Sequence, residues 1–151
     1  MPSLASRRGK ANRRRGHDYE REKAAFLRRW DPTAQRKLEY QKPQIPEDLK
    51  AKWLKKRAGI DIETKLPLGI QCKYGANANP FEAINEAERY IYLKYGNDQG
   101  APMPIAFTKK PGNGELVSMR PEDWEVLFNC CMVHPWTFRE SAAGAKTVGA
   151  K

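Results

Sequence analysis

The sequence predicts an α/β (α+β) fold in which helices flank a mixed β-sheet. Segments with helical and with strand-like periodicity are interleaved along the chain, in the order helix, strand, short helix, two strands, helix, two strands, helix. The chain has 151 residues, 40% of them hydrophobic, which is enough for one domain with a buried core. No internal repeat is visible.

The first predicted helix begins at Gly16 and is stopped by Pro32. One face is marked by residues that recur at helical spacing: Tyr19, Lys23, Phe26, Leu27 and Trp30. Glu20 falls in the first turn of this helix, where the helix dipole stabilises an acid. Glu20 is therefore either a dipole-matching residue or a carboxylate that the helix brings near the sheet.

Residues 34–40 form the candidate first strand, with Arg36 or Lys37 directed toward a partner. Two prolines interrupt the chain before a short helix over residues 47–57, whose acidic start and basic end match the helix dipole. The basic end, which includes Lys55 and Lys56, is compatible with dipole matching alone or with contact to a backbone phosphate.

The next two strands each have one polar and one apolar face, because strand side chains alternate. The polar positions are Asp61, Glu63, Gln71 and Lys73, and the apolar positions are Ile60, Ile62, Ile70 and Cys72. The segment 65–69 can turn the second strand back beside the first. Such a polar face can hold a divalent metal ion next to a fixed positive charge, or form a solvated ion pair between strands.

The remaining elements complete the predicted sheet and its cover. They are a helix that Asn79 caps and Gly96 ends, strands over 103–108 and 115–119 joined by a hairpin turn, and a short helix opened by Pro121. The buried stripe of the first of these helices is expected to comprise Phe81, Ile84, Ala87, Ile91 and Tyr95. In the last helix Trp124, Leu127 and Phe128 are compatible with a dimer interface or with ordinary core.

The positive charge is concentrated in the first third of the chain. Residues 1–57 hold 18 Lys and Arg against 7 Asp and Glu, whereas residues 58–151 hold 10 against 11. Such asymmetry favours a polyanionic partner, either nucleic acid or an acidic membrane surface. We predict a flexible basic arm over residues 1–15, a folded domain over 16–130 and a C-terminal tail over 131–151.

The cysteines and the hydropathy restrict the class of protein further. Three cysteines, two of them adjacent, do not form a disulfide framework or a zinc-finger pattern, and no apolar run is long enough to span a bilayer. We therefore expect reduced thiols, no membrane association and an intracellular, cytoplasmic protein. No sequence pattern indicates a small-molecule cofactor, a phosphate-binding loop or a catalytic triad.

Four stretches resemble the PD-(D/E)XK nuclease superfamily, and more closely its archaeal-type Holliday junction resolvases and their phage relatives. They are residues 15–21 at the start of the first helix, 59–62 and 69–73 in the two polar strands, and 80–88 in the following helix. The resemblance covers roughly residues 13–128. It implies a restriction-endonuclease-like αβββαβ core and, for a phage-encoded protein, location in the host cytoplasm.

The resemblance also implies a site and a reaction. Asp61, Gln71, the Cys72 main-chain carbonyl and Glu20 would bind Mg²⁺ or Mn²⁺, and Lys73 would orient or activate the attacking water. The basic residues that would contact DNA phosphates are Arg13, Arg14, Arg15, Arg21, Arg36, Lys37, Lys55 and Lys56. The expected activity is resolution of four-way DNA junctions by a homodimeric, metal-dependent endonuclease acting in recombination.

The chain departs from the family pattern at the second metal ligand, where Gln71 stands in place of the usual acid. Glu63 is a possible substitute, but residues i and i+2 of a strand are about 6.6 Å apart, so both it and Asp61 reach one ion only through a kink or a bridging water. Two other functions stay open: a restriction-type enzyme that cuts one duplex sequence, and a nucleic-acid-binding protein without catalysis.

Overall fold

The computed structural model describes residues 4–37 and 59–133 of the chain. By its internal contacts the chain divides into two compact units, residues 1–119 and 120–151. The second unit thus begins earlier than the end of the predicted folded domain over 16–130. In the described part of the chain no helix combines the length and the apolar character that crossing a membrane requires.

The first unit contains a five-stranded mixed sheet, which confirms the predicted mixed α/β class. The strands lie in the order β1 (Gln35–Arg36), β2 (Ile62–Glu63), β3 (Leu68–Tyr74), β4 (Met103–Lys110) and β5 (Gly114–Ser118). Only β3 and β4 pair in parallel, and the other neighbours are antiparallel. Because β3 and β4 are parallel, the chain between them must cross back over the sheet, and α3 (Pro80–Tyr95) does so.

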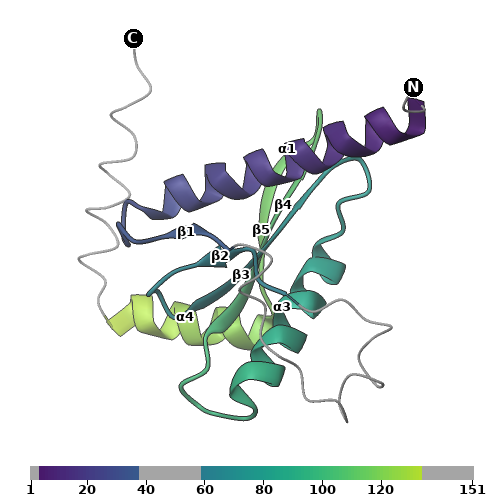
Figure 1. Ribbon diagram of the computed structural model, residues 1–151. Helices are drawn as coiled ribbons and strands as arrows, with labels where there is room; N and C mark the ends of the chain where they lie inside the picture. The colour runs from purple at the N-terminus through teal and green to yellow at the C-terminus, as the bar shows by residue number, and fades with distance from the viewer. Residues whose placement is uncertain (1–3, 38–58, 134–151) are drawn as a thin grey trace. The chain divides into compact units, whose positions relative to one another are not determined.

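Two helices cover the two faces of this sheet (Figure 1). On one face, α1 (Leu4–Leu27) packs Tyr19, Ala24 and Leu27 against the apolar side chains of β2, β3 and β4. Ile62 and Ile70 have no exposed surface there, and Cys72 is buried beside them, so the predicted apolar face of the two polar strands is confirmed. The main core therefore lies between α1 and the sheet.

The opposite face of the sheet packs against α3 at close range. Ala83 and Ile84 of the helix pack with Ala106 of β4. A Cβ placed on Gly69 of β3 would lie 2.5 Å from Cδ1 of Ile91, so only glycine fits at this crossing without movement. Since residues alternate along β3, Gln71 and Lys73 share the α3 face with Gly69, as predicted.

Helix α1 begins twelve residues before the predicted start at Gly16. Residues 4–15, assigned from their charge to a flexible arm, are helical. Ala, Arg and Lys are good helix formers and outweigh the single glycine of this stretch, Gly9. Glu20 consequently lies in the C-terminal third of the helix, and its predicted place in the first turn is wrong.

The end of α1 also differs from the prediction. The helix stops at Leu27, and Trp30, expected on the buried face, lies in the following turn with 60% of its surface exposed. Lys23 is buried as predicted, with its ammonium 2.6 Å from Glu115 of β5 and close to three aromatic rings. Tyr19 donates to the same carboxylate at 2.7 Å, so this polar contact attaches the edge strand to α1.

The predictions for the middle of the chain are tested only in part. Strand β1 lies within the expected strand 34–40, but residues 38–58, including the predicted short helix with Lys55 and Lys56, lie outside the described residues. Helix α3 has the predicted caps, with Asn79 accepting from the Phe81 amide and Gly96 at a φ of 62°. Ile84, Ala87 and Ile91 are buried as predicted, whereas Phe81 is 71% exposed and Tyr95 is also exposed.

The second unit contains α4 (Pro121–Val133), the predicted last helix. Trp124, Leu127 and Phe128 are all exposed, so the interpretation as ordinary core is wrong for these three side chains. The rings of Trp124 and Phe128 are stacked, with their centroids 4.9 Å apart. Most of the predicted tail over 131–151 lies outside the described residues.

The close contact between Gly69 and Ile91 leads to a test of the packing of α3 on β3. We expect Gly69→Ala to destabilise the protein by about 1–3 kcal/mol, because the new methyl group overpacks the interface. The Ile91→Val change removes Cδ1, the nearest atom, so Gly69→Ala should cost less in that background. Urea unfolding of the four proteins measures both costs, and equal costs in the two backgrounds would contradict this packing.

Candidate active site

The candidate site is located where β2 separates from β3. Ile62 pairs with Ile70, and the Asp61 amide still donates to the Ile70 carbonyl at 2.8 Å. The Cys72 amide, however, donates to the carboxylate of Asp61 at 2.8 Å. A side chain therefore replaces the backbone partner at this point, and the Asp61 carboxylate is held at the edge of β3.

The chain before Asp61 turns toward α3. The Gly59 amide donates to the Glu86 carbonyl at 3.1 Å, and a Cβ on Gly59 would lie 3.9 Å from Oε1 of Gln71. The residues that precede β2 thus contact the helix instead of continuing the sheet. This divergence brings the segment just before Asp61 close to both α3 and the Gln71 side chain.

A buried glutamate of α3 organises the polar face of β3. The Glu86 side chain is only 4% exposed, and its carboxylate accepts from Nε2 of Gln71 at 2.7 Å and from Nζ of Lys73 at 2.8 Å. The ammonium of Lys73 is within 2.8 Å of both carboxylate oxygens. Because a buried charge is costly without a partner, this ion pair fixes the side chains of both strand residues.

Glu86 was not among the residues that sequence reasoning selected. It lies in a helix that also contains Glu82 and Glu88, so its charge alone does not distinguish it. Its spacing does, because Ala83, Glu86, Ala87 and Tyr90 follow the i, i+3, i+4, i+7 pattern of one buried helix face. An acid on such a stripe needs a cationic partner inside the protein, which is the signal that could have identified it.

The electrostatics of Asp61 differ from those of an ordinary surface acid. Burial raises the pKa of Asp61 to about 7, the negative charges of Glu20 and Glu86 add to this rise, and the Cys72 amide and Lys73 oppose it. Glu20 of α1 is itself paired with Arg36 of β1. Asp61, by contrast, forms no ion pair with any described residue, although the charge of Lys73 lowers its pKa.

The oxygen atoms of Asp61 and Gln71 are the candidate ligands for a divalent metal ion. Oε1 of Gln71 is buried and accepts no hydrogen bond within the described part of the chain. An unpartnered amide oxygen near a carboxylate without a cation suits a hard ion that keeps several waters, such as Mg²⁺. Across residues 4–37 and 59–133, no three His, Cys, Asp or Glu side chains form a metal-binding group. Gln71 and waters would therefore have to contribute alongside Asp61.

The structure connects four of the predicted site residues through Asp61 and Glu86. Asp61 is within electrostatic reach of Glu20, Lys73 and Glu86, and Glu86 bonds both Gln71 and Lys73. Glu63 does not join them. It is exposed on the other side of β2 from the core, where Gln35 of β1 donates to it at 3.4 Å. The substitution of Glu63 for the missing acid is therefore not supported by its position.

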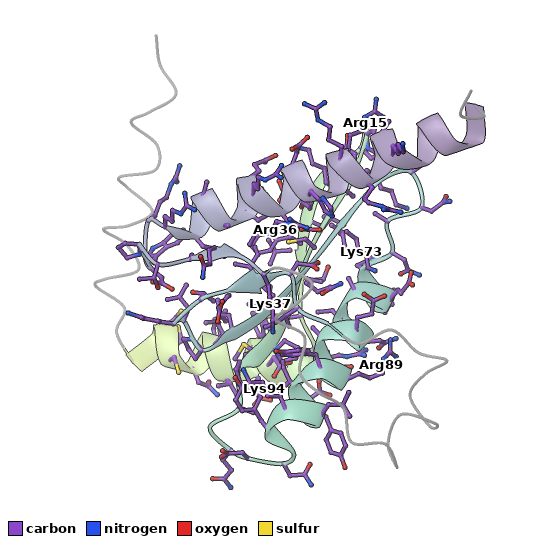
Figure 2. All side chains as sticks on the ribbon, viewed as in Figure 1. Arg15, Arg36, Lys37, Lys73, Arg89 and Lys94 are labelled. Atoms are coloured by element: carbon purple, nitrogen blue, oxygen red, sulfur yellow. The ribbon has the colours of Figure 1, made fainter. Side chains whose placement is uncertain are left out.

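The predicted phosphate contacts are distributed over several environments (Figure 2). Arg13, Arg14 and Arg15 are exposed on α1, and Arg21 is exposed but paired with Asp18 at 2.6 Å. Arg36 forms an ion pair with Glu20, and the Lys37 ammonium donates to the hydroxyl of Tyr90. Among the described candidates, the three consecutive arginines of α1 are thus the most accessible to a polyanion.

Comparison with known proteins identifies no relative: no family model, no curated protein and no solved structure matches the chain.

Proposed function

We propose that this protein is a metal-dependent endonuclease that hydrolyses phosphodiester bonds in branched DNA. The observation that carries the proposal is the grouping of Asp61, Gln71 and Lys73 at the edge of β3, with Glu86 behind them. An acid and an unpartnered amide oxygen can ligate a cation that activates water, and a fixed ammonium can orient that water for attack on a phosphate. The order of α1, β1–β3, α3 and β4 agrees with the αβββαβ order of the family that the sequence resembles.

Each residue has a separate role in this proposal. Asp61 and Gln71 would hold Mg²⁺ or Mn²⁺, and the Cys72 carbonyl and Glu20 are further candidates for direct or water-mediated contact. Bound there, the ion would lower the pKa of a water ligand and stabilise the charge that develops on the phosphate. Lys73 orients the attacking water, and Glu86 holds Lys73 in place.

Glu86 offers an explanation for the unusual Gln71. The position that carries an acid in the family pattern has lost its charge here, but Glu86 places a carboxylate 2.7 Å from the Gln71 amide nitrogen. The negative charge of the site is thus supplied from α3 instead of β3. We infer that Glu86 is the second acid of the site, acting through Gln71, Lys73 or a water.

The charge distribution supports a DNA substrate. The exposed arginines of α1 lie on the same helix as Glu20, so a strand bound along α1 would pass the site. The preference for four-way junctions rests on the sequence resemblance. Two symmetric cuts in a junction need two sites, which a twofold homodimer provides.

A non-catalytic DNA-binding protein is the second candidate, and one observation favours it. The charges of Glu86 and Glu20 are already neutralised within the protein by Lys73 and Arg36. Such pairing would also be found in a nuclease-like fold that had lost its reaction. The experiments below separate the two functions.

Substitutions at the site should separate catalysis from binding. We expect Asp61→Ala and Lys73→Ala to reduce cleavage at least about 100-fold while junction binding is retained, because both groups act on the reacting phosphate. Glu86→Gln should have a similar effect. Rates are measured on a labelled junction in Mg²⁺, and binding is measured in a chelator.

The matched control is Glu63→Gln, which removes one carboxylate from the neighbouring strand outside the group. It should leave the cleavage rate within about twofold, as is usual for a surface change. If Glu86→Gln keeps full cleavage activity and Glu63→Gln loses it, Glu63 and not Glu86 is the second acid of the site. Thermal melting of each variant separates lost chemistry from lost folding.

The substrate class is tested with matched four-way junction, flap and linear duplex DNA, each with and without a chelator. We expect cleavage of the junction in two strands, and none in the chelator, because the reaction needs both a branch and a cation. Cutting of linear duplex at a fixed sequence would favour a restriction-type enzyme. Binding without any scission in Mg²⁺ or Mn²⁺ would favour the non-catalytic protein.

The raised pKa of Asp61 predicts a pH-dependent stability without metal. The carboxyl ionises near pH 3.8 in the unfolded chain and near 7 in the folded protein, so the folded state keeps its proton longer and loses stability as pH rises between these values. Asp61→Asn abolishes this loss. The free energy of unfolding of the variant, relative to that of the wild type, should rise by up to about 1.4 kcal/mol per pH unit over that window. Above pH 7 this difference should stay constant.

Urea unfolding of both proteins at several pH values in a chelator measures this difference. Saturating Mg²⁺ should reduce the loss in the wild type, because a cation at Asp61 favours the ionised carboxylate. A stability difference that is equal at pH 4.5 and pH 8 would contradict the environment described for Asp61.

A further inference from the structure

A cavity of about 490 Å³ opens next to Lys73, on the side of the site nearest the N-terminal half of α1. Asn12 and Arg15 of α1 form one wall, and the loop from β3 to α3, residues 74–78, forms another. Figure 2 shows Arg15 on α1 and Lys73 on β3, the two cations of this cavity. A ligand in the cavity would therefore be in contact with the candidate active site.

We propose that this cavity binds one nucleotide of the DNA strand that is cut, next to the scissile phosphate. The proposal rests on the function proposed above and adds to it the path of the strand. It assigns Arg15 to the phosphate of that nucleotide and the amide side chains of Asn12 and Asn77 to its sugar or base. The strand then runs from the site at Lys73 toward α1.

The size and shape of the cavity favour a nucleotide over a simple anion. Its volume lies within the range of about 300–1,000 Å³ that is typical of small-molecule sites, whereas a lone phosphate would fill only part of it. The loop wall includes Gly75 at a φ of 134°, and a Cβ there would meet no atom within 4 Å. The backbone can thus approach a ligand closely at this position.

The charges in the lining favour an anion held by Arg15. This arginine is exposed and forms no salt bridge with a described residue, so its charge is available. Lys73 forms an ion pair with Glu86, and this pair fixes the position of the Lys73 ammonium. The N-terminus of α3 borders the loop, where helix dipoles favour negative charge.

Glu82, in the first turn of α3, also lines the cavity and opposes a phosphate there. Its negative charge weakens the binding of an anion, so removing it should strengthen binding. Substitution of Arg15 should therefore weaken binding and substitution of Glu82 should strengthen it. Loss of folding could not produce both results, because it would only weaken binding.

The test uses the full chain in an Asp61→Asn background, so that DNA is bound without being cut. The probes are a labelled four-way junction, an oligonucleotide of five thymidine nucleotides and thymidine monophosphate. Their binding is measured by fluorescence anisotropy or calorimetry over a range of salt concentrations. Arg15→Ala and Glu82→Gln are compared with Arg29→Ala. The control removes the same charge from the turn after α1, where Arg29 stacks on Phe26 outside the cavity.

We expect Arg15→Ala to weaken junction and oligonucleotide binding about fivefold. The loss of one phosphate contact should reduce the salt slope by about 0.9 for the junction and about 0.7 for the single-stranded oligonucleotide. Glu82→Gln should tighten both, and Arg29→Ala should change either by less than about twofold. In the active protein, Arg15→Ala should raise KM and leave kcat nearly unchanged.

The proposal is overturned if Arg15→Ala and Arg29→Ala behave alike, or if Glu82→Gln weakens binding. Tight binding of the monophosphate without binding of the oligonucleotide would identify a site for free nucleotides instead of a strand. If the wild type cuts DNA and Arg15→Ala matches the control, the cavity assignment fails while the nuclease stands. If the wild type cuts nothing but these variants shift binding as expected, the nuclease fails while the cavity stands as a binding site for one nucleotide of a DNA strand.

Discussion

A carboxylate buried between a helix and a sheet has to be neutralised in place, and Glu86 meets this requirement through β3. Its two oxygens accept from the Gln71 amide and the Lys73 ammonium at 2.7 and 2.8 Å. The cost of burying the charge is offset only while both partners keep this geometry. Glu86 therefore couples the docking of α3 to the orientation of the two strand side chains on which the proposed chemistry depends.

The other acid of the site, Asp61, is held by a different constraint. Its carboxylate takes the place of a backbone carbonyl opposite the Cys72 amide, at the point where the chain turns from the sheet to α3. Burial raises its pKa to about 7, and no described residue forms an ion pair with it. Glu86 is thus neutralised by Lys73, whereas Asp61 has no ion-pair partner among the described residues, and the proposed cation site depends on this difference.

Much of this arrangement could be predicted from local sequence patterns. The period-two alternation of β3 identified both its buried residues and the shared face of Gln71 and Lys73, and Asn79, Pro80 and Gly96 defined α3.

The predictions failed where tertiary contacts determine the structure. Glu86 has no local signature apart from its place on an apolar stripe, the helix propensity of residues 4–15 was hidden by their charge, and the exposure of Phe81 and Trp30 depends on where each helix meets the sheet. The cavity at Arg15 joins residues about 60 positions apart in sequence, so no local pattern could indicate it.

The central claim is that a divalent ion binds between Asp61 and Gln71, with Lys73 and Glu86 fixed beside it. Anomalous scattering from crystals of the protein soaked in Mn²⁺ tests this most directly. The account predicts one strong peak about 2.1 Å from an Asp61 carboxylate oxygen and from Oε1 of Gln71, with the Lys73–Glu86 pair intact. A Mn²⁺ peak that lies away from Asp61 and Gln71, in a protein that still cleaves DNA in Mn²⁺, would contradict it.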